Sequence, residues 1–207
     1  MKKILFAVAT FVAFSACAQD ISLVAPSKSR GSDIMQTFAR RQSVREYSDK
    51  DLSQQDLSDL LWATMGQNRD NGKLTAPSCQ NKQEIRLLVF TKDGVSEYLP
   101  ASHSLQKLVD GDYRALVADR QDFAKTAPVS LVMVADMDKF GKTDERAMMM
   151  VAVDAGIVSE NACVAAAGLG LATVPRASMD AEGIRKLLGF GDSQIFIMNN
   201  PVGYPAN

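Results

Sequence analysis

Histidine is almost absent from this chain, since His103 is the single one among 207 residues. Structural zinc sites use four Cys or His ligands, and the three cysteines form no Cys-x-x-Cys pair, so there are almost no ligands for zinc. A serine hydrolase of the usual type would need His103 as its base. Its setting in Ser102-His103-Ser104, before a predicted short helix, favours a polar capping role.

Neither sign of charge is in excess. The chain has 23 Lys and Arg against 24 Asp and Glu, with a net charge of −1. It therefore lacks the basic footprint of a nucleic-acid-binding protein. The 46% hydrophobic content is that of an ordinary globular protein with a sizeable core. No internal repeat or linker follows the first 20 residues, which favours one domain over two small ones.

The N-terminus has the layout of a secretory signal. Lys2-Lys3 precede an apolar stretch from Ile4 to Phe14, and small residues occupy positions 15–18. We predict a signal peptide over 1–18, an N-terminal extension over 19–32 and a domain over 33–207. Residues 14–17 also resemble a lipoprotein box, so lipidation at Cys17 stays open beside plain cleavage. Either way we expect an exported protein, periplasmic or lipid-anchored to the membrane. The cysteines that remain, Cys79 and Cys163, are predicted to be unpaired.

Hydrophobic periodicity and capping residues predict alternating helices and strands. Expected helices cover 33–41, 53–66, 103–109, 113–124, 144–168 and 180–189. Expected strands cover 85–90 and 95–99 as a hairpin, 129–135 buried on both faces, 171–174 and 194–198. Residues 67–84 form a long polar loop, and loops of this length in a compact domain are more often functional than idle.

Two helices carry notable apolar or small residues. In the first, Ile34, Met35 and Phe38 form the apolar face. Along 144–168, small residues that allow close helix approach recur at positions 152, 155, 156, 159, 162 and 166. Tight packing within one subunit and a helix–helix dimer seam are both open. The run Met148-Met149-Met150 is predicted to fill gaps in the core.

The segment Arg40–Tyr47 carries three guanidinium groups and a hydroxyl at the end of a predicted helix. Guanidinium is always charged, and its planar fork of donors matches phosphate oxygens. The segment is therefore a candidate seat for a phosphorylated ligand, with a solvated helix end as the alternative.

The same residues resemble the nitroreductase family. Residues 41–47 are similar to its Arg-x-Ser-x-Arg/Lys-x-aromatic signature, and 76–83 to its Ala-Pro-Ser-x-x-Asn-x-Gln loop. Residues 168–171 and 201–205 match its usual endings of the long helix and last strand. The resemblance covers about 33–205. It implies an α+β fold, with a mainly antiparallel sheet flanked by helices, and an intertwined homodimer with one FMN at each of two interfacial sites.

The resemblance also assigns roles to residues. Arg41, with Arg40 as a possible second, would bind the FMN phosphate; Ser43 would donate to the ribityl chain or phosphate; Arg45 would lie near flavin N1 and the C2 carbonyl. The partner's flavin would meet the 77–83 loop, and the 175–178 segment would place a backbone N–H at flavin N5. The full expected set is Arg40, Arg41, Gln42, Ser43, Arg45, Pro77, Ser78, Asn81, Gln83, Pro175, Arg176 and Ala177, with no catalytic side chain and no metal.

Two departures from the family pattern qualify these roles. Gln83-Glu84-Ile85 replaces the common Gln-Pro-Trp, as in the NADH dehydrogenase/NAD(P)H nitroreductase branch and in azoline dehydrogenases. A basic C-terminal tail that grips the phosphate in many members is not present, so Arg40, Arg41, backbone amides or a cation such as Lys107 would replace it.

The expected function is ping-pong hydride transfer by FMN from NAD(P)H to a nitroaromatic or quinone-type acceptor. Nicotinamide nucleotides are kept in the cytoplasm, so export leaves a flavin-dependent dehydrogenase or oxidase of an unknown small molecule open. A non-catalytic flavin-binding protein, or an exported structural domain without flavin, are the further alternatives.

Overall fold

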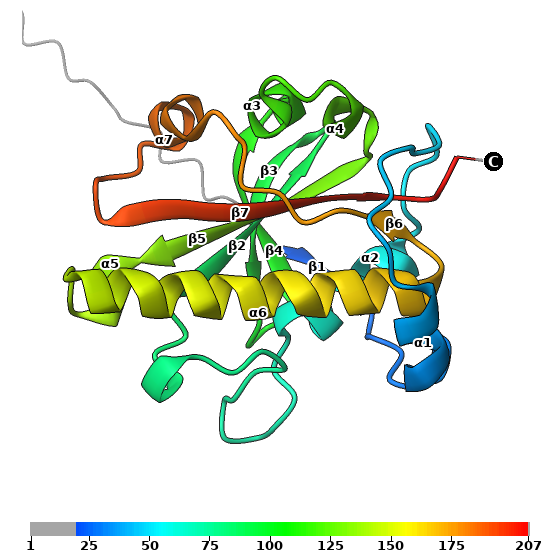
Figure 1. Ribbon diagram of the computed structural model, residues 1–207, viewed down its shortest axis with the longest axis horizontal. Helices are drawn as coiled ribbons and strands as arrows, with labels where there is room; N and C mark the ends of the chain where they lie inside the picture. The colour runs from blue at the N-terminus through cyan, green and yellow to red at the C-terminus, as the bar shows by residue number, and fades with distance from the viewer. Residues whose placement is uncertain (1–19, 207) are drawn as a thin grey trace, which may run out of the picture.

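The computed structural model describes residues 20–206. Its centre is a seven-stranded sheet in the order β1-β4-β3-β2-β5-β7-β6, in which all neighbouring strands are antiparallel (Figure 1). The strands are β1 (Ile21–Ser22), β2 (Ile85–Thr91), β3 (Gly94–Leu99), β4 (Ser104–Asp110), β5 (Val129–Asp136), β6 (Ala172–Thr173) and β7 (Gln194–Gly203). The predicted α+β class with an antiparallel sheet is confirmed.

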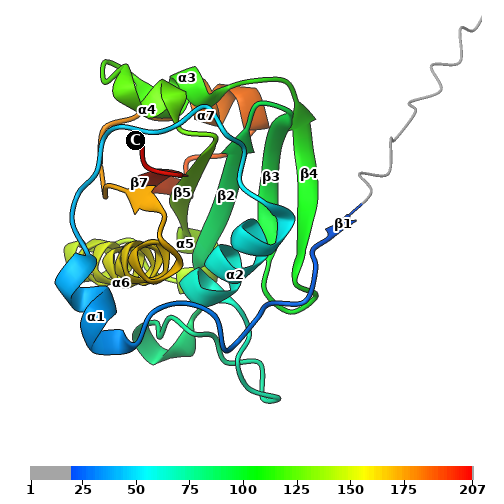
Figure 2. The same ribbon diagram turned by 90° about the vertical axis from the view of Figure 1, so that its right-hand side faces the viewer.

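Helices cover both faces of this sheet. They are α1 (Ile34–Arg40), α2 (Gln54–Met65), the 3-10 helix η1 (Cys79–Asn81), α3 (Arg114–Ala118), α4 (Phe123–Thr126), α5 (Met137–Phe140), α6 (Glu145–Leu169) and α7 (Ala181–Leu188). Figure 2 shows α2 and α6 on one face of the sheet, and α3, α4 and α7 on the other. The molecule therefore has three layers, with a hydrophobic core on each side of the sheet.

The interior strand β5 is buried on both faces, as predicted, and belongs to both cores. Its side chains alternate: Leu131 and Met133 pack in the core on the α2 and α6 side, and Val132 and Val134 in the core that also contains Ile184 of α7. All four are fully buried. The alternation follows from the two-residue period of a strand.

The long helix α6 begins and ends at local sequence signals. The Asp144 Oδ1 accepts a hydrogen bond from the N–H of Ala147 at 2.8 Å, and Gly170 ends the helix in the left-handed conformation with φ 75°. Gly168, predicted to help end it, lies inside the helix. By length and composition α6 could cross a membrane. Ala155 and Ala162 are fully buried against the sheet, however, so it is a core helix of this domain.

The small residues of α6 fall into two groups. Ala155, Ser159, Ala162 and Ala166 are buried, so close packing within one chain accounts for these four. Ala152 is exposed, and a Cβ added to Gly156 would meet no atom within 4 Å. Packing within one chain does not account for a small residue at either of these two positions.

The apolar side chains beside this second group are also uncovered. Met148 and Met149 are 36% and 55% exposed, so the prediction that they fill the core is wrong for a single chain. The apolar face predicted for α1 is uncovered as well, because Ile34, Met35 and Phe38 are 58%, 73% and 54% exposed. The buried residue of α1 is Thr37 instead.

One predicted helix is a strand. Residues 103–109 were predicted to be helical, but Ser104–Asp110 form β4, which pairs with β3. The apolar residues Leu105, Leu108 and Val109 have helical spacing, and pairing with a distant strand overrides it. The other helical stretch, 113–124, is divided into the short helices α3 and α4. The last strand runs on to Gly203 instead of ending at Met198.

His103 therefore does not cap a helix. It lies in the turn before β4, where its Nδ1 is 2.8 Å from the Tyr98 hydroxyl and its Nε2 is 2.8 Å from the Ser58 Oγ. Burial lowers the pKa of His103. The ring ties the β3–β4 turn to α2, which is a structural role.

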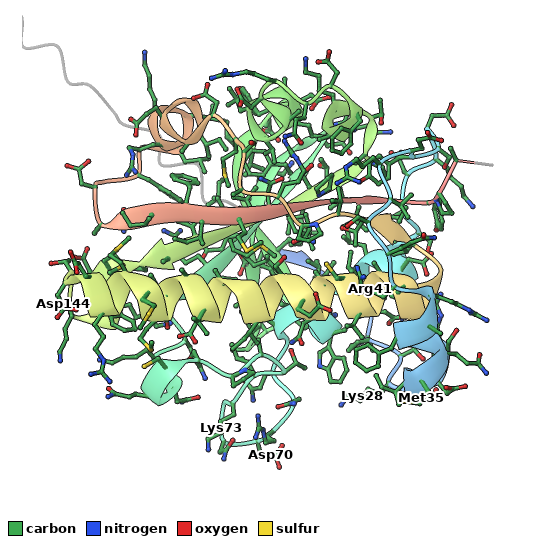
Figure 3. All side chains as sticks on the ribbon, in the orientation of Figure 1. Lys28, Met35, Arg41, Asp70, Lys73 and Asp144 are labelled. Carbon is green, nitrogen blue, oxygen red and sulfur yellow. The ribbon has the colours of Figure 1, made fainter. Side chains whose placement is uncertain are left out.

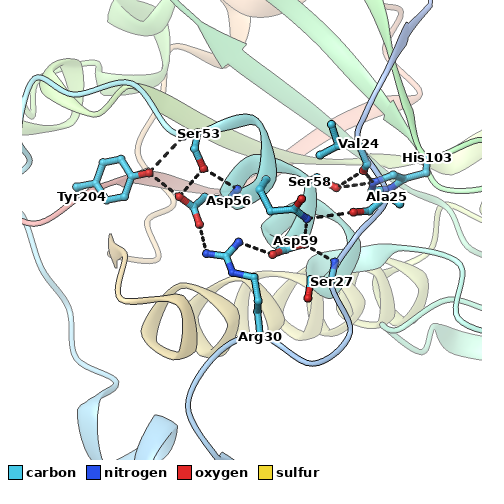
Figure 4. A network of polar contacts seen from close by, with 11 residues as sticks. Val24, Ala25, Ser27, Arg30, Ser53, Asp56, Ser58, Asp59, His103 and Tyr204 are labelled. Carbon is cyan, nitrogen blue, oxygen red and sulfur yellow. Dashed lines mark hydrogen bonds and ion pairs between the residues drawn. The ribbon is translucent and has the colours of Figure 1, made fainter.

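Residues 20–31 pack on the domain through a polar network (Figure 4). Arg30 forms ion pairs with Asp56 at 2.5 Å and Asp59 at 2.6 Å, and the Ser58 hydroxyl donates to the Val24 carbonyl. Although burial opposes it, hydrogen bonds from Ser53, Tyr204 and Arg30 lower the pKa of Asp56. This part of the predicted extension thus lies on α2 and adds β1 to the sheet. The predicted signal peptide and Cys17 lie outside the described residues.

Candidate functional site

The arginine-rich segment between α1 and α2 is attached to the edge of the sheet. The Val44 N–H donates to the Thr173 carbonyl of β6 at 2.9 Å, and the Tyr47 hydroxyl donates to the Val44 carbonyl at 3.0 Å. Tyr47 is buried, which raises its pKa and keeps the phenol protonated as a donor. The backbone of the segment is thus fixed by contacts that do not involve its arginines.

The side-chain donors of this segment take no part in those contacts. Within residues 20–206, the side chains of Arg41, Ser43 and Arg45 have no hydrogen-bond or ion-pair partner, while Arg40 donates to the Ser32 Oγ at 2.8 Å. The Arg45 guanidinium lies over the Phe123 ring, 6.0 Å from its centre. Fixed cations with free donors are what an anionic ligand requires.

A hollow of about 190 Å³ is lined by Arg40, Gln42 and Val44 of this segment, and Arg41, Ser43 and Arg45 do not line it. Its walls come from the arginine segment, the end of α6, β6 and the C-terminal segment: Arg40, Gln42, Val44, Cys163, Ala167, Gly170, Leu171, Ala172, Thr173 and Pro205. Burial, with Glu160 nearby, raises the pKa of Cys163 to about 11, so its thiol is neutral at physiological pH. Cys79 and Cys163 are both unpaired, as predicted.

The segment 175–178 lies close to the arginine segment in the structure, since Arg45 and Arg176 both contact the Phe123 ring. Arg176 is buried, and its guanidinium donates to the Gln121 side chain, to the Asn199 side chain and to the carbonyls of Val117 and Ala118. It also lies 5.5 Å from the centre of the Phe123 ring that Arg45 covers. Four of the five guanidinium N–H groups are thus used within the chain, so Arg176 anchors the segment.

The hydrogen bonds of this segment show which of its backbone N–H groups is free to donate to a ligand. The Arg176 N–H donates to the Asn199 carbonyl at 2.8 Å and is thereby used. Ala177 follows directly, is exposed, and its N–H has no acceptor among residues 20–206. Of the predicted set Pro175, Arg176 and Ala177, the structure leaves Ala177 as the free backbone donor.

The loop with Pro77, Ser78, Asn81 and Gln83 lies elsewhere on the chain. The Cys79 N–H donates to the Asp154 Oδ2 at 2.7 Å, in the middle of α6. The hollow at Cys163 is nine residues, or about 14 Å of helix, further along. Gln80, Asn81 and Gln83 have φ values of 52°, 55° and 51°, a strained conformation that clusters at functional sites. A single chain does not bring this loop to Arg41.

Lys107 is engaged within its own strand region. Its Nζ donates to the Asp93 carbonyl and to the Asp110 Oδ1, both at 3.1 Å. It lies on β4, which β3, β2, β5 and β7 separate from β6 in the sheet. Lys107, named above as one candidate cation for the phosphate, lies across the sheet from Arg41 and cannot serve at the arginine segment of its own chain.

A buried carboxyl pair was missed by the sequence analysis. Glu84 is fully buried, and neither of its carboxylate oxygens has a hydrogen-bond donor within the described chain. Burial, together with the nearby Asp154, raises the pKa of Glu84 to about 7. The protonated carboxyl can donate to a carboxylate where the ionised one cannot, which reconciles the two observations. The sequence feature that could have revealed this pair is Glu84 itself, which stands where the family's Gln-Pro-Trp pattern has proline.

This burial predicts a pH-dependent stability. A carboxyl whose pKa is higher in the folded state stabilises the fold at low pH, and the contribution is lost as pH rises through about 7. Between pH 5 and 8 we expect the free energy of unfolding to fall by about 2 kcal/mol, and Glu84→Gln to remove most of this slope. Urea unfolding at several pH values measures it. The surface variant Glu182→Gln serves as control, and an unchanged slope in Glu84→Gln would show that Glu84 is not the group.

The comparisons with known proteins agree with this architecture. A model of the nitroreductase family matches residues 38–204. A Methanocaldococcus jannaschii protein named "putative nitroreductase" is 30% identical over 174 residues, which cover 79% of this chain and 87% of that protein. A Methanothermobacter thermautotrophicus protein named "putative NADH dehydrogenase/NAD(P)H nitroreductase" is 25% identical over 178 residues, covering 84% and 78%.

Solved structures give the same result. The crystal structure of a "putative nitroreductase" from Ralstonia eutropha superposes with a TM-score of 0.85 at 29% identity, covering 100% of this chain and 97% of the other. One from Desulfovibrio desulfuricans, in complex with FMN, has a TM-score of 0.62 at 21% identity, covering 85% and 88%, and shows a shared fold. The chain belongs to the nitroreductase family.

Proposed function

We propose that the protein reduces nitroaromatic or quinone-type acceptors with NAD(P)H in ping-pong turnover, as a homodimer with one FMN at each of two interfacial sites. As a member of its family it is an FMN-dependent oxidoreductase. The observation that carries the proposal is the set of free donors at Arg41, Ser43 and Arg45 on a backbone fixed to β6.

The donor set fits FMN. Arg41 offers a planar fork for the phosphate, and Ser43 a hydroxyl for the phosphate or the ribityl chain. Arg45 supplies the cation that would lie near flavin N1 and the C2 carbonyl, where negative charge on the reduced cofactor needs stabilisation. Ala177 supplies the backbone donor. Bound FMN supplies the redox chemistry, and the chain holds and orients it.

The site is incomplete in one chain. The hollow next to the arginine segment measures about 190 Å³, less than the about 300–1,000 Å³ that enclose a ligand of this class, and Arg41, Ser43 and Arg45 lie outside its lining. The loop with Pro77, Ser78, Asn81 and Gln83 lies too far along α6 to close it. We propose that this loop from a second copy contacts the flavin, which accounts for the loop's strained backbone.

We propose that the second copy packs on exposed side chains of α1 and α6, two helices that contact each other. This surface consists of uncovered apolar side chains and two small residues: Ile34, Met35, Phe38, Met149, Ala152, Val153 and Gly156. Exposed apolar side chains of this kind are typical of protein–protein interfaces. Gly156 would allow the close approach of a partner helix.

The first test is the visible spectrum. The protein reconstituted with FMN should be yellow, and anaerobic NADH or NADPH should bleach the flavin band in stopped flow. A nitroaromatic or quinone added afterwards should restore it, because ping-pong turnover separates the two half-reactions. Free FMN at the same concentration is the control.

The alternative outcomes identify other functions. A flavin that dithionite bleaches but neither nicotinamide does would favour a dehydrogenase or oxidase with another donor. A flavin that only photoreduction or dithionite reduces, with no restoration by acceptors, would favour a carrier. We also propose export, on the charged and apolar pattern of residues 2–18, and the intact mass of the mature chain distinguishes cleavage from lipidation at Cys17.

A further inference from the structure

A second hollow, of about 240 Å³, lies at the opposite end of α6 from the arginine segment. Figure 3 shows Asp144 at one end of this helix and Arg41 near the other. The helix has 25 residues and is therefore about 37 Å long. The hollow is lined by η1, α5 and the first turns of α6: Cys79, Gln80, Lys82, Phe140, Lys142, Asp144, Arg146, Ala147 and Met150.

The rim of this hollow is basic. Lys82, Lys142 and Arg146 come from three different segments, and none has a hydrogen-bond or ion-pair partner for its side chain in the part of the chain that is described. The rim carries one carboxylate, Asp144, and its Oδ1 already accepts the Ala147 N–H at 2.8 Å. Three free cations at the positive end of a long helix favour an anionic ligand.

The floor of the hollow is apolar. Phe140 and Ala147 are buried and belong to the main core, with Met150 packed against it. The Lys82 ammonium lies 5.8 Å from the centre of the Phe140 ring. Inorganic phosphate would pair with the cations but leave the apolar side chains of the floor exposed to solvent. A flat organic body with an acidic group would cover the floor and pair with the rim at the same time.

The hollow also adjoins the loop assigned to the partner's flavin. Cys79, Gln80 and Lys82 line it and belong to the 77–83 loop. A ligand bound here would lie beside the cofactor of the other subunit and far from the arginine segment of its own. The position suits a molecule that exchanges electrons with that cofactor.

We infer that this hollow binds the electron acceptor, and that the preferred acceptors are aromatic compounds with a carboxylate or sulfonate group, such as acidic quinones and nitroarenes. The inference rests on the proposed function and adds the substrate class. Lys142 and Arg146 select for the negative charge of the acceptor, and the apolar floor that includes Phe140 contacts its aromatic ring.

The test is calorimetric titration of the flavin-loaded protein with anthraquinone-2-sulfonate, which needs no turnover. We expect the double variant Lys142→Gln, Arg146→Gln to raise the dissociation constant about tenfold, because two charge-assisted contacts are lost. Both residues are exposed, so folding should be unaffected. Lys186→Gln, an exposed cation on α7, should bind as the parent does. Added salt should weaken binding to the parent more than to the double variant.

Steady-state kinetics provide the second arm. In the double variant the KM for anthraquinone-2-sulfonate should rise, and the KM for neutral menadione should stay the same. An unchanged dissociation constant would overturn the inference, as would a raised KM for NADH or NADPH with no effect on the sulfonate. Sulfonate binding by a protein whose flavin no nicotinamide bleaches would overturn the proposed donor alone, so the two failures are distinguishable.

Discussion

Replacing Arg41 by alanine (Arg41→Ala) should raise the dissociation constant for FMN by about tenfold to a hundredfold. A charge-assisted, bidentate contact contributes about 1.5–3 kcal/mol. Arg176 is buried and uses four of its five N–H donors within the chain, and Lys107 lies across the sheet. Quenching of FMN fluorescence on titration with the apoprotein measures the change.

Two further variants separate geometry from charge. Arg41→Lys keeps the charge but loses the planar fork, so we expect an intermediate affinity. Lys186→Ala removes one positive charge from α7 and should leave FMN binding unchanged. Equal FMN loading in Arg41→Ala and the parent protein would remove Arg41 from the phosphate site.

A charge placed on the exposed face of α6 should dissociate the dimer and release its flavin together. Val153 is 51% exposed in the single chain and lies between Met149 and Gly156 on that face. Val153→Glu would bury an unpaired carboxylate in the proposed interface, at a cost of several kcal/mol. Size-exclusion chromatography with light scattering, together with the flavin-to-protein ratio, reports both losses.

The controls use the same helix. Val153→Leu keeps the side chain apolar and should remain dimeric with flavin bound. Gly156→Leu should also weaken the dimer, because the open space seen beside Gly156 in one chain would be filled by the partner helix. A monomeric parent protein, or a Val153→Glu variant that keeps both dimer and flavin, would place the interface elsewhere.

Local signals made most of the fold predictable. Asp33, Ser53, Asp144 and Asp180 each accept a backbone hydrogen bond at the start of a helix that was predicted near that position. The prediction failed at β4, whose apolar spacing matches a helix. Its strand state depends on pairing with β3 and on an edge strand, β1, that joins it from the N-terminal segment.

The candidate site was predictable only where its residues are contiguous. The segment Arg40–Arg45 was found because its chemistry is concentrated in six positions. The network around Arg176 was not, since it joins residues 117–121 and Asn199 through the tertiary fold. The pair of Glu84 and Asp154 is separated by 70 positions in the sequence, so no local pattern reveals it.

The central claim is that FMN binds at the arginine segment and between two copies of the chain. Sedimentation velocity of the FMN-loaded protein, recorded at the flavin absorbance band, tests it most directly. We predict that all bound flavin sediments with a dimer, at one FMN per chain. Flavin that sediments with a monomer, or a dimer that sediments without colour in excess FMN, would contradict the account.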